Sequence, residues 1–266
     1  MAKTIITAGI DIGSTASKVV ILADQKMISQ YIGPSTVNPS KMSRLVYQEA
    51  LNAAGISMDM VDYIVGTGYG RGKVDFANEN VSEISCHAKG AHLLLPTTRT
   101  IIDMGGQDTK VISIDKHGLI IEFAMNDKCA AGTGRFLDFM ARSMGLEIKD
   151  MVRLHFEEGT PSVISNMCSV FAESEVINLI NEEVPLPCIV KGLHLSIANK
   201  VSTLARRAGL AKDVVITGGV AKNRGVVDSL ENILKFKTLV FPEEIDPQLI
   251  GAVGAAALAF ERVLKK

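Results

Sequence analysis

The chain carries one short pattern twice, and this repeat constrains the fold more than any other feature. An apolar run, an Asp-x-Gly turn and a second apolar run opened by lysine recur 92 residues apart, so that Asp11, Gly13, Lys18 and Val19 align without gaps with Asp103, Gly105, Lys110 and Val111. Each copy predicts a β-hairpin whose glycine-rich tip presents backbone N–H groups to an anion. Such a duplication predicts two similar domains that face one another and grip a polyphosphate between their hairpins.

Apolar periodicity predicts the other elements. Strands are expected at 4–10, 18–22 and 27–32 around a turn at 11–17, at 100–102, 109–114 and 119–123 in the second copy, and helices at 40–54, 83–91 and 188–208. A later strand from Asp213 ends at Gly218 and Gly219, where adjacent glycines let the backbone approach a flat ligand or a phosphate. The Ala-rich last helix has small residues that permit close packing against the first domain.

Two cysteines precede helix-like patterns. Cys129 stands before the Gly-rich turn of residues 130–134, and Cys168 stands directly before another apolar helical pattern. The partial positive charge at a helix N-terminus favours a thiolate. Two thiolates suit an iron–sulfur cluster, which needs four, so a closed cluster requires two chains related by a two-fold axis. Two buried core thiols are the alternative, because a separation of 39 residues fits no CxxC pattern.

The length, net charge, apolar runs and cysteine count of the chain limit the classes of function that it can have. A length of 266 residues fits two domains, expected at 1–97 with 250–266 and at 98–249. A net charge of −1 argues against nucleic acid or an anionic membrane as partner. The longest apolar run, 252–260, is too short to cross a bilayer, and Asp11 ends the first apolar run too early for a signal peptide. Four cysteines do not make a disulfide scaffold, so a reducing cytoplasm is the expected compartment.

Two phosphate hairpins followed by a Thr-Gly-Gly turn resemble the actin, sugar-kinase and heat-shock chaperone ATPase superfamily. Within it, the stretches 11–18, 103–108, 126–136 and 168–175 resemble the activators of 2-hydroxyacyl-CoA dehydratases, over nearly the whole chain. The resemblance implies an α/β fold of two actin-like (ribonuclease-H-like) domains with a nucleotide cleft between them. It also implies a homodimer that shares one [4Fe–4S] cluster, hydrolyses ATP with Mg²⁺ and passes one low-potential electron to a partner iron–sulfur protein. A ferredoxin or flavodoxin would reload it.

The resemblance also implies site residues. Cluster ligands are Cys129 and Cys168, and nucleotide contacts come from Gly13, Ser14, Thr15, Ala16, Ser17, Lys18, Gly105, Gly106, Gln107, Gly218, Gly219 and Gln248. Asp11, with Asp103, is the candidate to hold Mg²⁺ through water. Gln107 is the candidate to orient the attacking water. A small-molecule kinase of the same fold is the alternative, with Asp103 or Asp127 as general base.

Overall fold

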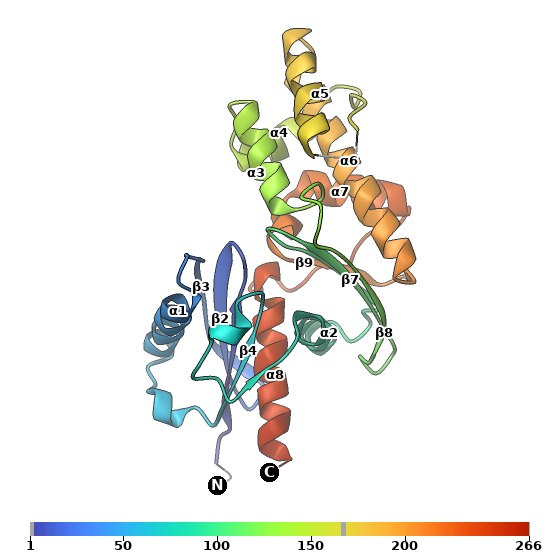
Figure 1. Ribbon diagram of the computed structural model, residues 1–266. Helices are drawn as coiled ribbons and strands as arrows, with labels where there is room; N and C mark the ends of the chain where they lie inside the picture. Colours follow the sequence, from blue (N-terminus) through green and yellow to red (C-terminus); the bar gives the residue numbers. More distant parts are fainter. Residues whose placement is uncertain (1–2, 166–168, 266) are drawn as a thin grey trace. The chain divides into compact units, whose positions relative to one another are not determined.

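The structure is a computed structural model that describes residues 3–165 and 169–265 (Figure 1). The chain divides into two compact units: the first contains Met1–Ile101, Ile114–Ile121 and Phe241–Lys266, and the second contains Ile102–Ser113 and Glu122–Val240. The division differs from the expected boundaries mainly at 114–121 and 241–249, which belong to the first unit. Residues 114–121 do so because Gly118, with φ of 79°, lies against the His92 ring.

The first unit is built on a sheet with the strand order β3-β2-β1-β4-β5. Its elements are β1 (Ile6–Ile12), β2 (Ala16–Ala23), β3 (Lys26–Pro34), α1 (Pro39–Ala54), β4 (Tyr63–Thr67), β5 (Glu79–Asn80), α2 (Glu83–Leu94) and α8 (Ile250–Leu264), with 3-10 turns at Met58–Met60, Arg71–Lys73 and Pro247–Leu249. Strand β1 pairs antiparallel with β2 and parallel with β4. Because side chains alternate along a strand, Val19 and Ile21 of β2 pack in the core beside α1, whereas Val20 and Leu22 pack with α8.

Helix α8 packs closely because glycines remove side chains at its contacts. A Cβ on Gly254 would lie 1.7 Å from the Cys86 carbonyl oxygen of α2, and one on Gly90 would lie 2.2 Å from the Ile250 carbonyl oxygen. A Cβ on Gly9 of β1 would lie 2.0 Å from the Ala252 carbonyl oxygen. The expected packing of the last helix against the first domain is therefore confirmed.

The segment Pro247–Leu264 is long and apolar enough to cross a membrane, although 61% of it is buried within the fold. This segment is longer than the apolar run 252–260 noted in the sequence, because the helical residues continue beyond both ends of that run. Buried core helices meet the same criterion, so this is weak evidence for a membrane span.

The second unit is built on a sheet with the strand order β8-β7-β6-β9. Its elements are β6 (Thr100–Met104), β7 (Thr109–Ile114), β8 (Ile120–Asn126), α3 (Gly134–Ser143), α4 (Ile148–His155), α5 (Ser169–Asn181), α6 (Leu186–Arg207), β9 (Val214–Thr217), α7 (Arg224–Leu234) and a 3-10 turn at Gly219–Lys222. One apolar core joins β6, β7 and β9 to the helices, with Met104, Met140, Leu193 and Val214 fully buried or nearly so.

Two expectations need correction. The first hairpin turn is shorter than residues 11–17: β1 runs to Ile12 and β2 begins at Ala16, because Asp11 pairs with Lys18 and Ile12 with Ser17 across the ladder. Helix α4 was not expected, and the strand pattern did not indicate β5. Both are short elements, for which periodicity is a weak signal.

Candidate functional site

The hairpin of the first unit holds a buried ion pair behind an open tip. Asp11 is the second-last residue of β1, and its Oδ2 lies 3.1 Å from the Nζ of Lys18 on β2. The Gly13 N–H donates to the Ala16 carbonyl at 3.1 Å, and a Cβ on Gly13 would lie 2.7 Å from that oxygen. The tip therefore consists of Gly13, Ser14 and Thr15. Ser14 is half-buried and Thr15 is exposed.

Ser17 is not at this tip. Its hydroxyl is fully buried and lies 2.9 Å from the Ser35 hydroxyl, which in turn donates to the Gly13 carbonyl at 2.6 Å. The structure therefore places Ser17 beneath the tip, where it braces the turn. Ala16 is half-buried at the start of β2.

The second unit repeats this geometry at the residues that align in sequence. The Gly105 N–H donates to the Asp108 carbonyl at 3.0 Å, as Gly13 does to Ala16. Lys110 Nζ lies 3.6 Å from the Asp103 carboxylate and 2.7 Å from that of Asp108. The predicted duplication thus extends to the hydrogen-bond pattern of the turn and to the buried Asp–Lys pair.

A second loop in each unit closes on the aspartate of that unit's hairpin, a part of the repeat that was not predicted from the sequence. Gly68 follows β4 with φ of 92°, and Gly218 follows β9 with φ of 85°. A Cβ would meet Asp11 Oδ1 at 2.4 Å from Gly68 and Asp103 Oδ1 at 2.9 Å from Gly218. The Thr-Gly pairs 67–68 and 217–218 carry the signal that could have revealed it.

The threonine of the second pair contacts the carboxylate directly, because Thr217 Oγ1 donates to Asp103 Oδ1 at 3.0 Å. Gly219, the other member of the predicted adenosine turn, begins the 3-10 turn that follows. Gln248 lies in the first unit within the turn Pro247–Leu249; it is half-buried, and its N–H donates to Asp246 Oδ1 at 2.9 Å.

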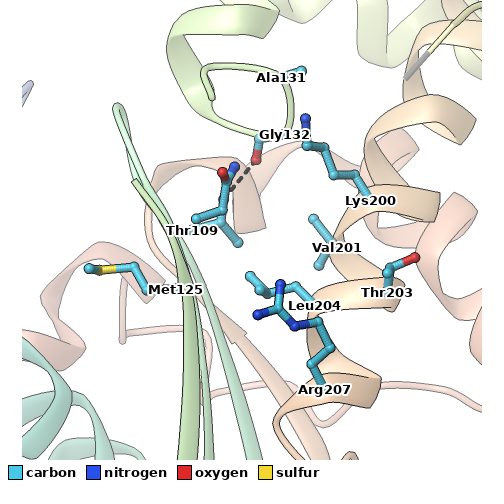
Figure 2. A pocket seen from close by; sticks show the side chains of 10 residues that line it. Thr109, Met125, Ala131, Gly132, Lys200, Val201, Thr203, Leu204 and Arg207 are labelled. Carbon is cyan, nitrogen blue, oxygen red and sulfur yellow. Dashed lines mark hydrogen bonds between the residues drawn. The ribbon is translucent and has the colours of Figure 1, made fainter. Parts of the chain in front are cut away.

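The second hairpin tip is bonded to the start of α3. The N–H groups of Gly134 and Arg135 donate to the carbonyls of Gly105 and Gly106 at 2.9 and 3.0 Å. Thr109 Oγ1 donates to the Gly132 carbonyl at 2.8 Å (Figure 2). Groups that a helix N-terminus leaves without intrahelical partners are thereby satisfied by the tip. A shift of the tip must therefore move the Cys129 loop or break these bonds.

Side chains reinforce the link. Gln107 is exposed at the tip, and its amide oxygen accepts from the Arg135 guanidinium at 2.5 and 3.2 Å in the orientation that matches acceptor to donors. Arg135 belongs to the stretch 126–136 noted in the sequence, but nothing in that stretch indicated that Arg135 pairs with Gln107.

The half-buried Cys129 thiol lies in this loop, four residues before the N-cap Thr133 of α3. Burial opposes its ionisation, but hydrogen bonds from the Lys200 ammonium, at 2.9 Å, and from the Ala131 N–H outweigh burial and lower the pKa of the thiol. Cys86, by contrast, is fully buried, and burial raises its pKa to about 12. Cys86 is therefore a core thiol. Cys168 lies outside the described residues.

Lys200 was not predicted, because it reaches the loop from α6. Figure 2 shows its side chain pointing from α6 toward Ala131 and Gly132, with Arg207 farther along the same helix. These residues line a cavity of about 330 Å³ together with Thr109, Met125, Asn126, Val201, Thr203 and Leu204.

Comparison with known proteins places this geometry in a family. Residues 8–259 match the model of the BadF/BadG/BcrA/BcrD ATPase family. The chain belongs to that family. It is 47% identical over 264 residues to the "Activator of lactoyl-CoA dehydratase" of Anaerotignum propionicum, covering 98% of this chain and 99% of that protein.

Solved structures agree with this assignment. The (R)-2-hydroxyglutaryl-CoA dehydratase component A of Acidaminococcus fermentans superposes with a TM-score of 0.92 at 41% identity, covering 98% of this chain and 99% of that one. The 2-hydroxyisocaproyl-CoA dehydratase activator of Clostridium difficile, with bound ADPNP, superposes with a TM-score of 0.91 at 41% identity. The match covers 98% of this chain and 96% of that one. A ROK family glucokinase of Streptomyces griseus shares the fold alone, with a TM-score of 0.62 at 11% identity. The match covers 96% of this chain and 99% of that one. The expected actin-like and sugar-kinase fold is confirmed.

The residues present fit the groups that this ATPase family implies. A thiol that accepts hydrogen bonds from an ammonium and an N–H suits a cluster ligand, because ligands to iron are thiolates. Within residues 3–165 and 169–265, no group of three or more His, Cys, Asp or Glu side chains is arranged to hold a metal ion. Asp11 and Asp103 can each offer a carboxylate, and Mg²⁺ usually takes one or two carboxylates, waters and phosphate oxygens.

Proposed function

We propose that this protein is an ATP-hydrolysing one-electron donor to a partner iron–sulfur protein, a 2-hydroxyacyl-CoA dehydratase or a related double-cubane-cluster protein. The electron carrier is a [4Fe–4S] cluster shared by a homodimer, with Cys129 and Cys168 from each subunit as ligands. Ferredoxin or flavodoxin is the proposed electron source. When bound, the cluster supplies a one-electron couple at low potential.

One observation carries this proposal: hydrogen bonds join the Cys129 loop and the start of α3 to the second hairpin. Gly134 and Arg135 donate to Gly105 and Gly106, and Thr109 donates to Gly132, at 2.8–3.0 Å. A conformational change can couple two sites only if each site favours one arrangement of a shared element. Here the shared element is the start of α3, which a phosphate at the tip and a ligand at Cys129 both bias.

Residues of each hairpin have separate tasks in ATP binding. The tip N–H groups and the hydroxyls of Ser14 and Thr15 hydrogen-bond phosphate oxygens. Lys18 and Lys110 balance the buried carboxylates Asp11 and Asp103, at 3.1 and 3.6 Å, until Mg²⁺ and phosphates arrive. Gly218 and Gly219 form the adenosine turn, and Gln248 contributes a further nucleotide contact.

Gln107 is the proposed residue that orients the attacking water. Its amide oxygen faces Arg135, and because that contact holds the oxygen, the amide N–H₂ group is left with a set direction. Water held by a fixed amide is positioned for in-line attack, the role that glutamines have in other phosphoryl-transfer sites.

The kinase alternative has weaker support. Its solved counterpart shares the fold at 11% identity, whereas full-length relatives at 41–47% identity are named as dehydratase activators or components. A kinase also has no use for a thiol that a lysine ammonium contacts at 2.9 Å.

Iron and acid-labile sulfide, measured per dimer after anaerobic purification, test the proposal. We expect about four of each, a brown colour that bleaches in air, and a mass in solution of two chains. Cys129→Ser and Cys168→Ser should each abolish cluster binding and electron transfer, while Cys188→Ser, a half-buried cysteine elsewhere, should keep both. A colourless protein, or a Cys129→Ser variant that reduces its acceptor as the parent does, would overturn the proposal.

A further inference from the structure

Lys200 contacts the sulfur that is proposed to bind iron, although 71 residues separate it from Cys129 in the chain. Its Nζ donates a hydrogen bond to Cys129 Sγ at 2.9 Å, and the residue is half-buried on α6. At this distance the ammonium carries a full positive charge directly against a ligand sulfur.

Packing holds the lysine side chain in this position. Its Cδ would lie 3.7 Å from a Cβ on Gly132, which is an ordinary packing distance, so the aliphatic part lies along the cysteine loop. Lys200, Gly132 and Arg207 all line the cavity of about 330 Å³ (Figure 2). The cavity leaves room for a longer side chain at position 200, so conservative variants can be accommodated.

We propose that Lys200 raises the reduction potential of the shared cluster, and slows its loss, by donating a charged hydrogen bond to the Cys129 sulfur. This inference rests on the proposed function. Hydrogen bonds to ligand sulfurs and nearby charge are among the factors that set cluster potentials. Reduction adds one electron to the cluster and changes no covalent bond. The added negative charge is therefore stabilised by Lys200, which favours the reduced state.

Two variants and a matched control test this role. Lys200→Met keeps the apolar stem and removes the charge, and Lys200→Arg keeps the charge. Arg207→Met removes a cation from the same cavity without touching a proposed ligand, because within the described residues the hydrogen bond to the Cys129 sulfur comes from Lys200 and not from Arg207. Each protein is purified anaerobically as the cluster-loaded dimer, checked for its fold by circular dichroism, and titrated with dithionite while the reduced cluster is followed by electron paramagnetic resonance. Iron release to a chelator is measured separately.

We expect Lys200→Met to lower the ratio of reduced to oxidised cluster at a fixed potential about tenfold, a downward shift of about 59 mV for a one-electron couple. Iron should leave it several-fold faster. Lys200→Arg should keep most of the parental potential, and Arg207→Met should change the ratio less than about twofold. A folded Lys200→Met chain that takes up no iron, beside normal loading of the other two variants, also supports the role.

Unchanged potential and iron release in loaded Lys200→Met would overturn the role of Lys200 and leave the proposed function intact. An equal shift in Arg207→Met would overturn it too, because the effect would then come from general charge rather than from the bond. A parent protein that binds no iron at all would overturn both proposals.

Discussion

Replacing Gly218 by alanine tests whether the Thr-Gly loop positions Asp103. Gly218 has φ of 85° and ψ of 178°, a region that is essentially restricted to glycine and costs other residues about 1–3 kcal/mol. Its Cβ would also lie 2.4 Å from the Met104 carbonyl oxygen and 2.9 Å from Asp103 Oδ1. Overpacking against backbone costs about 1–3 kcal/mol, and reduced freedom of the unfolded chain returns about 0.4–1 kcal/mol.

The sum is a loss of about 3 kcal/mol in the free energy of unfolding, or about 6–12 °C in Tm, for Gly218→Ala. Gly145→Ala is the control: its φ is 68°, but nothing lies within 4 Å of the added Cβ, so it tests an alanine at positive φ without the steric clash. We expect about 1 kcal/mol there. Circular dichroism melts give the stabilities, and calorimetric titration with ADPNP gives affinity, which should fall at least tenfold only in Gly218→Ala. Equal Tm and equal nucleotide affinity in parent and Gly218→Ala would refute the reasoning.

The remaining predictions concern hydrolysis and acid stability. Gln107→Ala should slow ATP hydrolysis about 100-fold with ATP affinity nearly unchanged, because the attacking water is no longer oriented. The control is Gln48→Ala, on the exposed side of α1. Full ATPase activity in Gln107→Ala would exclude the role. Burial, and the charge of neighbouring His155, lower the pKa of His194 to about 3 from 6.5. The unfolded chain therefore binds a proton that the folded chain excludes, so this contribution to stability is present above pH 6.5 and is lost as pH falls toward 3. The loss should be at most about 1.4 kcal/mol per pH unit. Melts from pH 7 to pH 4 should show a shallower pH slope for His194→Gln; parallel slopes would contradict the assignment.

Several features could be predicted from the sequence because they depend on local pattern. The two hairpins, with Asp11 and Asp103 at the ends of strands and lysines opposite, follow from period-2 alternation and turn residues that repeat at one offset. Turn length was less accurate, because the ladder register carries β1 to Ile12 and starts β2 at Ala16.

Contacts between distant segments were decided only by the tertiary structure. Lys200 reaches Cys129 because α6 packs beside the cysteine loop, and Gly218 closes on Asp103 because β9 lies next to β6 in the sheet. Gly254 looked like one small residue among many, but it is where α8 and the α2 backbone meet. A sequence pattern reports which face of an element is apolar, whereas the partner of that face is selected by packing over the whole unit. Residue types and turns were therefore readable in advance, and the pairings that build the site were not.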